Sequence, residues 1–185
     1  MTDIFEIPDS YNEKAWVNDD QYREMYRESI ENPEKFWSEQ AERISWFKKW
    51  DTVLDWDYHE AHIRWYEGGK LNVSYNCLDR HLKKRGDQIA LIWEGDDPPE
   101  DRSYTYSQLH EQVCRFANVL KNHGIEKGDR VMIYMPMVPE LPIAMLACAR
   151  LGVTHSVVFG GFSSEALKAR ILDLDARVVI TADGG

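Results

Sequence analysis

The sequence is short of basic residues and of long apolar runs. It has 22 lysines and arginines against 32 acidic residues, which gives a formal net charge of −10. An acidic surface repels phosphate backbones and anionic membranes, so general binding to nucleic acid or to acidic lipid is excluded. No window approaches the roughly 20 apolar residues that a membrane-spanning helix needs. The acidic start has no basic stretch followed by an apolar run, so we predict no secretory signal and a cytoplasmic protein.

Cysteine is also scarce, with Cys77, Cys114 and Cys148 far apart in the chain. None of them belongs to a Cys-x-x-Cys pair or to a Cys/His pattern with metal-ligand spacing. We therefore interpret all three as buried, reduced thiols inside helices. His59 and His62 have His-x-x-His spacing, but no further ligand candidate accompanies them, so the sequence predicts no metal site.

The strongest positive feature is an alternation of apolar strands and amphipathic helices after residue 128. We expect strands over 130–134, 155–159 and 178–182, with helices over 140–151 and 165–174 between them. This alternation predicts an α/β fold with a doubly wound, mainly parallel sheet. No helix follows the last strand, so we expect the sheet to be incomplete. Its edge and apolar face should be exposed and should invite self-association.

The first 70 residues are rich in aromatic side chains and poor in aliphatic ones, since six of the seven tryptophans lie there. Asp19 and Asp20 are expected to cap one helix, and Asn32 with Pro33 to begin another. Residues 45–70 show no clear period. We interpret them as an irregular segment whose aromatic residues pack onto the rest of the chain. The whole region is predicted to be a helical and irregular cap segment.

Local signals also organise the middle of the chain. A helix is expected from Asn72 to near Gly86, followed by a hairpin of strands over 88–94 and 102–105. The sequence Thr105-x-x-Gln108 is a capping box that opens the next helix. That helix should end at Gly124 and bury Leu109, Val113, Phe116, Ala117 and Leu120.

Two loops follow strand ends, which is where sheets of this kind bind ligands. In the loop over 159–163, Gly160 and Gly161 would let the backbone approach a ligand without Cβ interference. Ser163 can cap the following helix, whose free N–H groups favour a phosphate or another anion. The alternative is a tight turn with a serine cap. The loop over 135–139 is expected to serve packing, and no catalytic constellation is recognisable.

Several short strings run in one order along residues 20–185. They include Trp-Tyr-Glu-Gly-Gly at 65–69, Trp-Glu-Gly-Asp-Asp at 93–97, Tyr-Met-Pro-Met-Val-Pro-Glu at 134–140 and Phe-Gly-Gly-Phe-Ser at 159–163. Together they resemble the AMP-forming acetyl-CoA synthetases of the adenylate-forming (acyl-CoA synthetase/luciferase-like) superfamily. The resemblance implies two domains. Residues 1–86 would be the N-terminal cap segment of that family, and residues 87–185 the start of its AMP-binding domain.

The resemblance further implies a ligase that acts in two steps. Acetate and ATP would give acetyl-adenylate and pyrophosphate, and the thiol of CoA would then displace AMP, with Mg²⁺ bridging the ATP phosphates. The family's Lys-Gly phosphate loop, its Tyr-Gly-x-Thr-Glu-like motif, its hinge Asp and its catalytic Lys are absent from this sequence. We therefore predict an inactive N-terminal piece that binds none of these ligands tightly. The resemblance also implies that Gly160 and Gly161 contact the nucleotide part of CoA.

Other interpretations stay open. Propionyl-CoA and other short-chain acyl-CoA synthetases are similar in this region, and the residues that size the acyl pocket are not in this sequence. The chain could also be a non-catalytic module that binds CoA or a nucleotide. A third possibility is an interaction protein whose aromatic N-terminal third docks on a partner.

Overall fold

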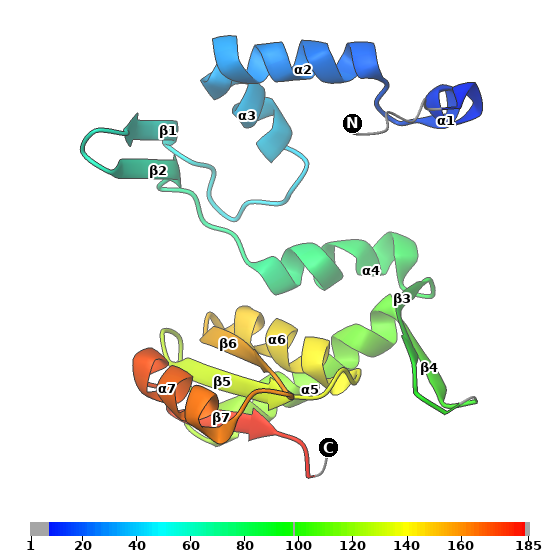
Figure 1. Cartoon of the computed structure of the whole chain (residues 1–185), viewed down its shortest axis with the longest axis vertical. Coiled ribbons are helices and arrows are strands. Elements are labelled where there is room, and N and C mark those ends of the chain that lie inside the picture. The colour runs from blue at the N-terminus through cyan, green and yellow to red at the C-terminus, as the bar shows by residue number, and fades with distance from the viewer. Residues whose placement is uncertain (1–7, 98, 184–185) are drawn as a thin grey trace, which may run out of the picture. The chain divides into compact units, whose positions relative to one another are not determined.

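The computed structural model describes residues 8–97 and 99–183, which divide into two units (Figure 1). The first unit holds the described residues up to Ile44 together with Lys48–Lys70. The second unit holds Ser45–Phe47 and the described residues from Leu71 onward. Within the described part of the chain, every helix is too short or too polar to cross a bilayer.

Three helices begin the first unit: α1 (Asp9–Lys14), α2 (Asp19–Glu31) and α3 (Pro33–Ala41). The expected cap of α2 was wrong by one residue. Asn18 is the N-cap, because its side chain accepts a hydrogen bond from the Gln21 N–H at 2.9 Å while Gln21 accepts from the Asn18 N–H at 3.0 Å. The two aspartates that follow Asn18 lie in the first helical turn, where their charge complements the helix dipole.

Helix α3 starts where the sequence predicted, with Pro33 as its first residue. Proline suits this position because its missing N–H would have no partner within the helix. The Asn32 backbone occupies the N-cap position, but its side chain makes no capping hydrogen bond.

The segment over 45–70 is not irregular, which corrects the expectation. It contains an antiparallel hairpin of β1 (Thr52–Asp57) and β2 (His62–Glu67). The Asp57 carboxylate closes the turn by accepting the N–H groups of His59 at 2.9 Å and Glu60 at 3.3 Å. A side chain therefore supplies the turn that a glycine or proline usually signals in a sequence.

Aromatic side chains join α3 to this hairpin. The Trp37 ring lies edge-on to Phe36 at 5.1 Å and to Trp65 at 5.7 Å between centroids. Tyr66 stacks edge-on against Trp50 at 5.2 Å and donates its hydroxyl to the Trp37 carbonyl at 2.9 Å. Edge-to-face pairs of this kind add stabilisation beyond the buried area alone. These contacts lie within the first unit, whereas Phe47 meets Tyr75 edge-on within the second unit at 5.2 Å between centroids, and Trp16 is fully exposed.

The second unit begins with a helix that changes pitch. A single π-helical stretch (η1, Tyr75–Asp79) runs into α4 (Arg80–Arg85). The hairpin predicted next is present as β3 (Ile89–Glu94) paired antiparallel with β4 (Asp101–Thr105).

The capping box at the start of α5 (Tyr106–Asn122) is confirmed. Thr105 accepts from the Gln108 N–H at 3.2 Å, and Gln108 accepts from the Thr105 N–H at 2.9 Å. The predicted apolar face is buried at Leu109, Val113, Ala117 and Leu120. Phe116 is buried in part and packs against this core.

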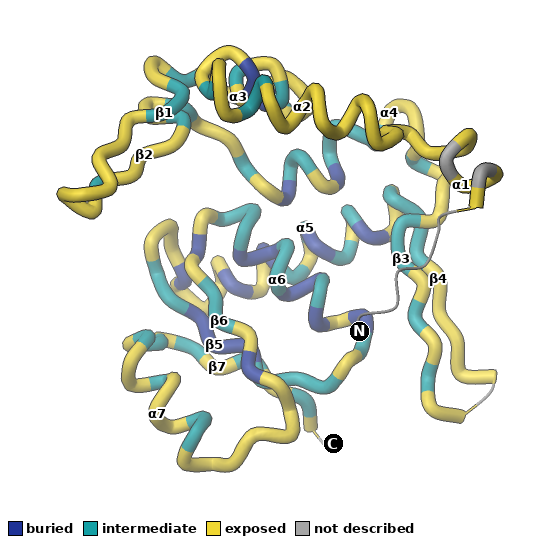
Figure 2. The backbone as a smooth tube through the Cα atoms, turned by 45° about the horizontal axis from the view of Figure 1, so that its top comes forward, coloured by how far each residue is buried: buried dark blue, intermediate teal, exposed yellow. Residues whose placement is uncertain are grey.

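The centre of the second unit is the predicted parallel sheet. Its order is β6 (Thr154–Phe159), β5 (Arg130–Met135), β7 (Val178–Thr181), with β5 parallel to both neighbours. The connecting helices are α6 (Glu140–Leu151) and α7 (Ser164–Leu174). Helices α5 and α6 lie together on one side of the sheet and α7 lies on the other (Figures 1 and 2).

The core of this unit lies between β5 and its helices, where the buried segments concentrate (Figure 2). Val131 and Ile133 are fully buried in the cluster that includes Ala147 and Cys148 of α6. Met132 alternates with them and is also fully buried, so both faces of the central strand are covered. The outer strands are less protected, since exposed fractions are 41% at Val157 and at Val179 and 65% at Phe159.

The prediction of three buried thiols was wrong for Cys77. Cys148 is buried and Cys114 is half-buried, whereas Cys77 is exposed, and all three are free. Each lies in a helix as expected, but Cys77 is on the outer side of the π-helical stretch, where the core does not reach it.

Candidate functional site

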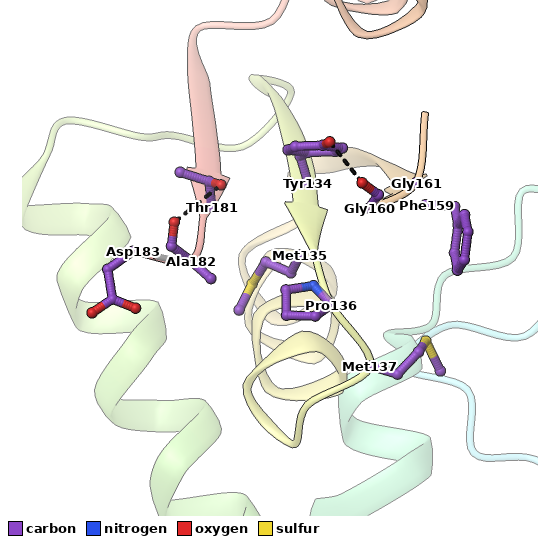
Figure 3. A pocket seen from close by; sticks show the side chains of 10 residues that line it. All are labelled: Tyr134, Met135, Pro136, Met137, Phe159, Gly160, Gly161, Thr181, Ala182 and Asp183. Carbon is purple, nitrogen blue, oxygen red and sulfur yellow. Dashed lines mark hydrogen bonds between the residues drawn. The ribbon is translucent and has the colours of Figure 1, made fainter. Parts of the chain in front are cut away.

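A cavity of about 450 Å³ opens at the carboxyl ends of the three parallel strands (Figure 3). It is lined by Tyr134, Met135, Pro136, Met137, Phe159, Gly160, Gly161, Thr181, Ala182 and Asp183. The structure thus brings together the loops after β5, β6 and β7, which lie far apart in the sequence. This is the edge at which open α/β sheets bind ligands.

Gly160 and Gly161 both line the cavity, but for different reasons. A Cβ on Gly160 would meet nothing closer than the Met135 carbonyl oxygen at 3.7 Å, which is an ordinary contact. A Cβ on Gly161 would come within 2.9 Å of the Phe159 ring. A side chain at 161 would therefore require the Phe159 ring, which is 65% exposed, to move. The fold has room for a side chain at 160, and that side chain would occupy space beside the cavity.

The start of α7 follows the glycine loop. The Ser163 side chain caps it by accepting the Ala166 N–H at 3.3 Å, as the sequence predicted. The pKa of Glu165 lies below its usual value because the carboxylate accepts hydrogen bonds from its own N–H and from the hydroxyls of Ser164 and Ser163. The helix N-terminus therefore already faces a negative charge from the chain itself, which weakens the expectation of a phosphate bound there.

The loop between β5 and α6 is held by the β3–β4 hairpin. The Trp93 indole N–H donates to the Met137 carbonyl at 2.7 Å, and the Arg102 guanidinium lies 5.5 Å from the centre of the Trp93 ring. Arg102 also reaches Glu140, the first residue of α6, at 3.3 Å. The sequence reasoning missed this role of Trp93, because 44 residues separate donor and acceptor.

The loop over 135–139 was expected to serve packing, which is correct for Pro139 and wrong for Met137. Pro139 is fully buried, whereas the Met137 side chain is 72% exposed and lines the cavity. A second hollow of about 430 Å³ includes Trp93 and Arg102 and shares five residues with the first. The shared residues are Met135, Pro136, Thr181, Ala182 and Asp183.

The chemistry of the cavity is apolar and backbone-rich. Among the described residues that line it, none is basic, and Asp183 contributes a carboxylate. Such a surface can contact a ring or a pantetheine-like chain, but it offers no cation to a phosphate group. No group of three His, Cys, Asp or Glu side chains that could hold a metal ion occurs within residues 8–97 and 99–183.

A separate polar cluster fastens the π-helical stretch to α5 and α6. Arg150 donates to both carboxylate oxygens of Asp79, at 2.7 and 2.8 Å, and His110 Nε2 lies 3.3 Å from Asp79. The hydrogen bonds from Arg150 are the main reason why the pKa of Asp79 lies below its usual value and that of Arg150 above it. Asn72 adds a hydrogen bond to the Ala149 carbonyl at 2.8 Å.

This cluster was not predicted from the sequence. The His110 side chain is 25% exposed. Its carboxylate partner lies 31 residues away and the arginine 40 residues away, so no local spacing could reveal the contact. None of these side chains lines the cavity at the strand ends. We therefore assign the cluster a structural role.

Two family profiles match the chain. The profile described as "AMP-binding enzyme" matches residues 78–184, which is more than half of the sequence. The chain therefore belongs to the AMP-binding enzyme family. The profile described as "Acetyl-coenzyme A synthetase N-terminus" matches residues 22–77 and confirms the resemblance drawn from the sequence strings.

Curated relatives agree with these profiles. The chain is 59% identical over 183 residues to the acetyl-coenzyme A synthetase of Magnetococcus marinus. The aligned region covers 98% of this chain and 28% of that protein. It is 60% identical over 187 residues to that of Syntrophus aciditrophicus, with coverage of 100% and 29%. It is 57% identical over 183 residues to acetyl-coenzyme A synthetase 2 of Pseudomonas aeruginosa, with coverage of 98% and 28%. The chain thus spans somewhat more than a quarter of the length of these relatives.

Proposed function

We propose that this chain is the N-terminal part of an AMP-forming acetyl-CoA synthetase. The whole protein would convert acetate and ATP into acetyl-adenylate and pyrophosphate. The thiol of CoA would then attack the acetyl carbonyl and release AMP. The names of the relatives and the two matching profiles support this assignment.

The single observation that carries the proposal is the 59% identity, over 98% of this chain, to the acetyl-coenzyme A synthetase of Magnetococcus marinus. The free space at Gly160 supports a binding role for the glycine loop. The fold does not need a glycine there, because an added Cβ would make only ordinary contacts. The absence of a side chain instead keeps the backbone open to the cavity, as a closely approaching ligand requires. We assign Gly160 and Gly161 to the nucleotide part of CoA, and we assign no catalytic or metal-binding residue to this chain.

The chemistry of the cavity limits what this chain does alone. CoA is polyanionic, and the described lining supplies no basic side chain to its phosphates. Those charges would be met by residues of the whole protein outside this chain, so we expect weak CoA binding by the chain itself. Asp183 is one carboxylate and not a magnesium site. ATP and Mg²⁺ would therefore be ligands of the whole protein, and we assign no residue of this chain to them.

The domain division and the cellular setting are part of the same proposal. Residues 1–86 would form the N-terminal cap segment and residues 87–185 the start of the AMP-binding domain. The placement of α6 and α7 on opposite faces of the sheet supports a doubly wound topology (Figure 1). We place the protein in the cytoplasm. Where β6 and β7 stay uncovered, their exposed apolar side chains would favour self-association.

A chimaera tests the function. This chain replaces the matching segment of the Magnetococcus marinus protein, and acetyl-CoA and AMP are measured with acetate, ATP, Mg²⁺ and CoA. We expect an active chimaera, and no pyrophosphate release from the 185-residue chain alone. A folded but inactive chimaera would contradict the assignment. Turnover by the chain alone would overturn its predicted inactivity.

A further inference from the structure

The glycine loop is held from the neighbouring strand by one hydroxyl group. Tyr134 Oη lies 2.8 Å from the Gly160 carbonyl oxygen (Figure 3). It lies 3.3 Å from the carbonyl oxygen of Phe162. A phenol has one hydrogen to donate, so the two carbonyls share a single donor. The carbonyl oxygens of Gly160 and Phe162, which flank Gly161, therefore both face the Tyr134 hydroxyl at the end of β5.

Besides this hydroxyl, the loop is held by contacts at its own ends. The Phe159 and Phe162 rings meet edge-on at 6.3 Å between centroids, and the Arg170 guanidinium lies 5.1 Å from the centre of the Phe162 ring. The turn of the loop is closed by the Phe162 N–H, which donates to the Phe159 carbonyl at 3.1 Å. Two consecutive glycines have no side chains to anchor them, and glycine is the residue with the greatest backbone freedom. Tyr134 is half-buried at the end of the central strand, whose neighbouring residue Ile133 is fully buried. The donor thus sits on the central strand of the sheet.

We infer that Tyr134 is a positioning residue for CoA, a role that rests on the proposed function because it acts through the glycine loop. The hydroxyl fixes the peptide that carries the Gly160 carbonyl, at a cavity wall to which Tyr134 and Gly160 both contribute. Without that donor the carbonyl oxygen would be free to reorient, and its partial negative charge would repel the phosphates of a CoA nucleotide. Loss of the hydroxyl should therefore weaken CoA binding and leave acetyl-adenylate formation unchanged.

The first test uses this chain by itself and does not depend on the function. Tyr134→Phe removes the hydroxyl and keeps the ring. Tyr104→Phe is the matched control, since Tyr104 is half-buried in the same unit, lies outside the cavity lining, and its hydroxyl has no hydrogen bond among the described residues. A hydrogen bond of ordinary net strength changes an equilibrium about five-fold. We expect the Phe162 amide to exchange about five-fold faster in Tyr134→Phe alone, and equal exchange in both variants would overturn the inference.

The second test measures the consequence for CoA in the chimaera. Tyr134→Phe should raise KM for CoA about five-fold, with kcat, KM for ATP and acetate, and acetate-dependent pyrophosphate exchange unchanged. Tyr104→Phe should leave all of these values unchanged. An active chimaera in which Tyr134→Phe has an unaltered KM for CoA would contradict the inference. A wild-type chimaera that makes no acetyl-CoA would instead overturn the proposed function and with it the role toward CoA. Faster exchange of the Phe162 amide in Tyr134→Phe would then still show that the hydroxyl holds the glycine loop.

Discussion

Replacing Asp79 with asparagine should lower the free energy of unfolding by about 2 kcal/mol. An exposed ion pair contributes about 0–1 kcal/mol, whereas removing one partner of a buried pair costs about 3–5 kcal/mol. The side chains of Arg150 and Asp79 are 28% and 19% exposed, so this pair falls between the two cases. The substitution also removes one of the two carboxylate oxygens to which Arg150 donates, and it leaves the Arg150 guanidinium without an anionic partner.

Urea denaturation followed by far-UV circular dichroism measures the change. Glu111→Gln is the matched control, because it breaks the Arg115–Glu111 pair on α5, whose side chains are 68% and 58% exposed. We expect the control to change the unfolding free energy by less than about 0.5 kcal/mol. An Asp79→Asn variant as stable as the control would refute the view that this cluster fastens the π-helical stretch to the sheet-covering helices.

The same pair predicts a direction for acid sensitivity. The pKa of Asp79 is lower in the folded chain than its usual value of 3.8, chiefly because Arg150 donates hydrogen bonds to it. Its contribution to stability is therefore fully present above that usual value, and it is lost as the pH falls toward the lower, folded-state pKa. The stability gap between the wild-type chain and Asp79→Asn should narrow below about pH 4. A gap that stays constant down to pH 2 would argue against this carboxylate as the source.

Two further predictions concern helix α5 and the thiols. Thr105→Ala should cost about 1 kcal/mol of unfolding free energy in urea denaturation, because it removes half of a capping box, and an unchanged midpoint would contradict this. A thiol reagent at neutral pH should modify exposed Cys77 long before Cys148, since Cys148 is buried and burial raises its pKa to about 11. Peptide mapping after partial labelling checks the order, and equal rates at the two sites would show that the core opens readily.

Local signals in the sequence were sufficient for much of the second unit. The capping box at Thr105 and the alternation of apolar strands with helices act over a few residues, so the sequence alone predicts the parallel sheet and the start of α5. Gly160 and Gly161 could be recognised because a glycine pair at a strand end is itself a local pattern. Their proximity to Thr181 and Asp183 followed from the rule that parallel strands end at one edge.

The features that were missed depend on side chains acting at a distance or in place of the usual turn residues. The β1–β2 hairpin has no glycine or proline in its turn, because the Asp57 carboxylate closes it. The loop contact of Trp93 and the pairing of Asp79 with Arg150 span 44 and 71 residues, and they exist only once the strands and helices are packed. Cys77 is exposed within a π-helical stretch, which helical periodicity does not predict.

The account depends most on the claim that the open backbone at Gly160 faces CoA. Gly160→Ala and Gly160→Val place side chains of increasing size there, and the first added atom meets nothing closer than 3.7 Å. In the chimaera we predict a graded rise in KM for CoA, at least about ten-fold for valine since one well-placed contact pair of 1.4 kcal/mol corresponds to that factor. Pyrophosphate exchange and the urea midpoint should stay unchanged. An unaltered KM for CoA in both variants would contradict the claim.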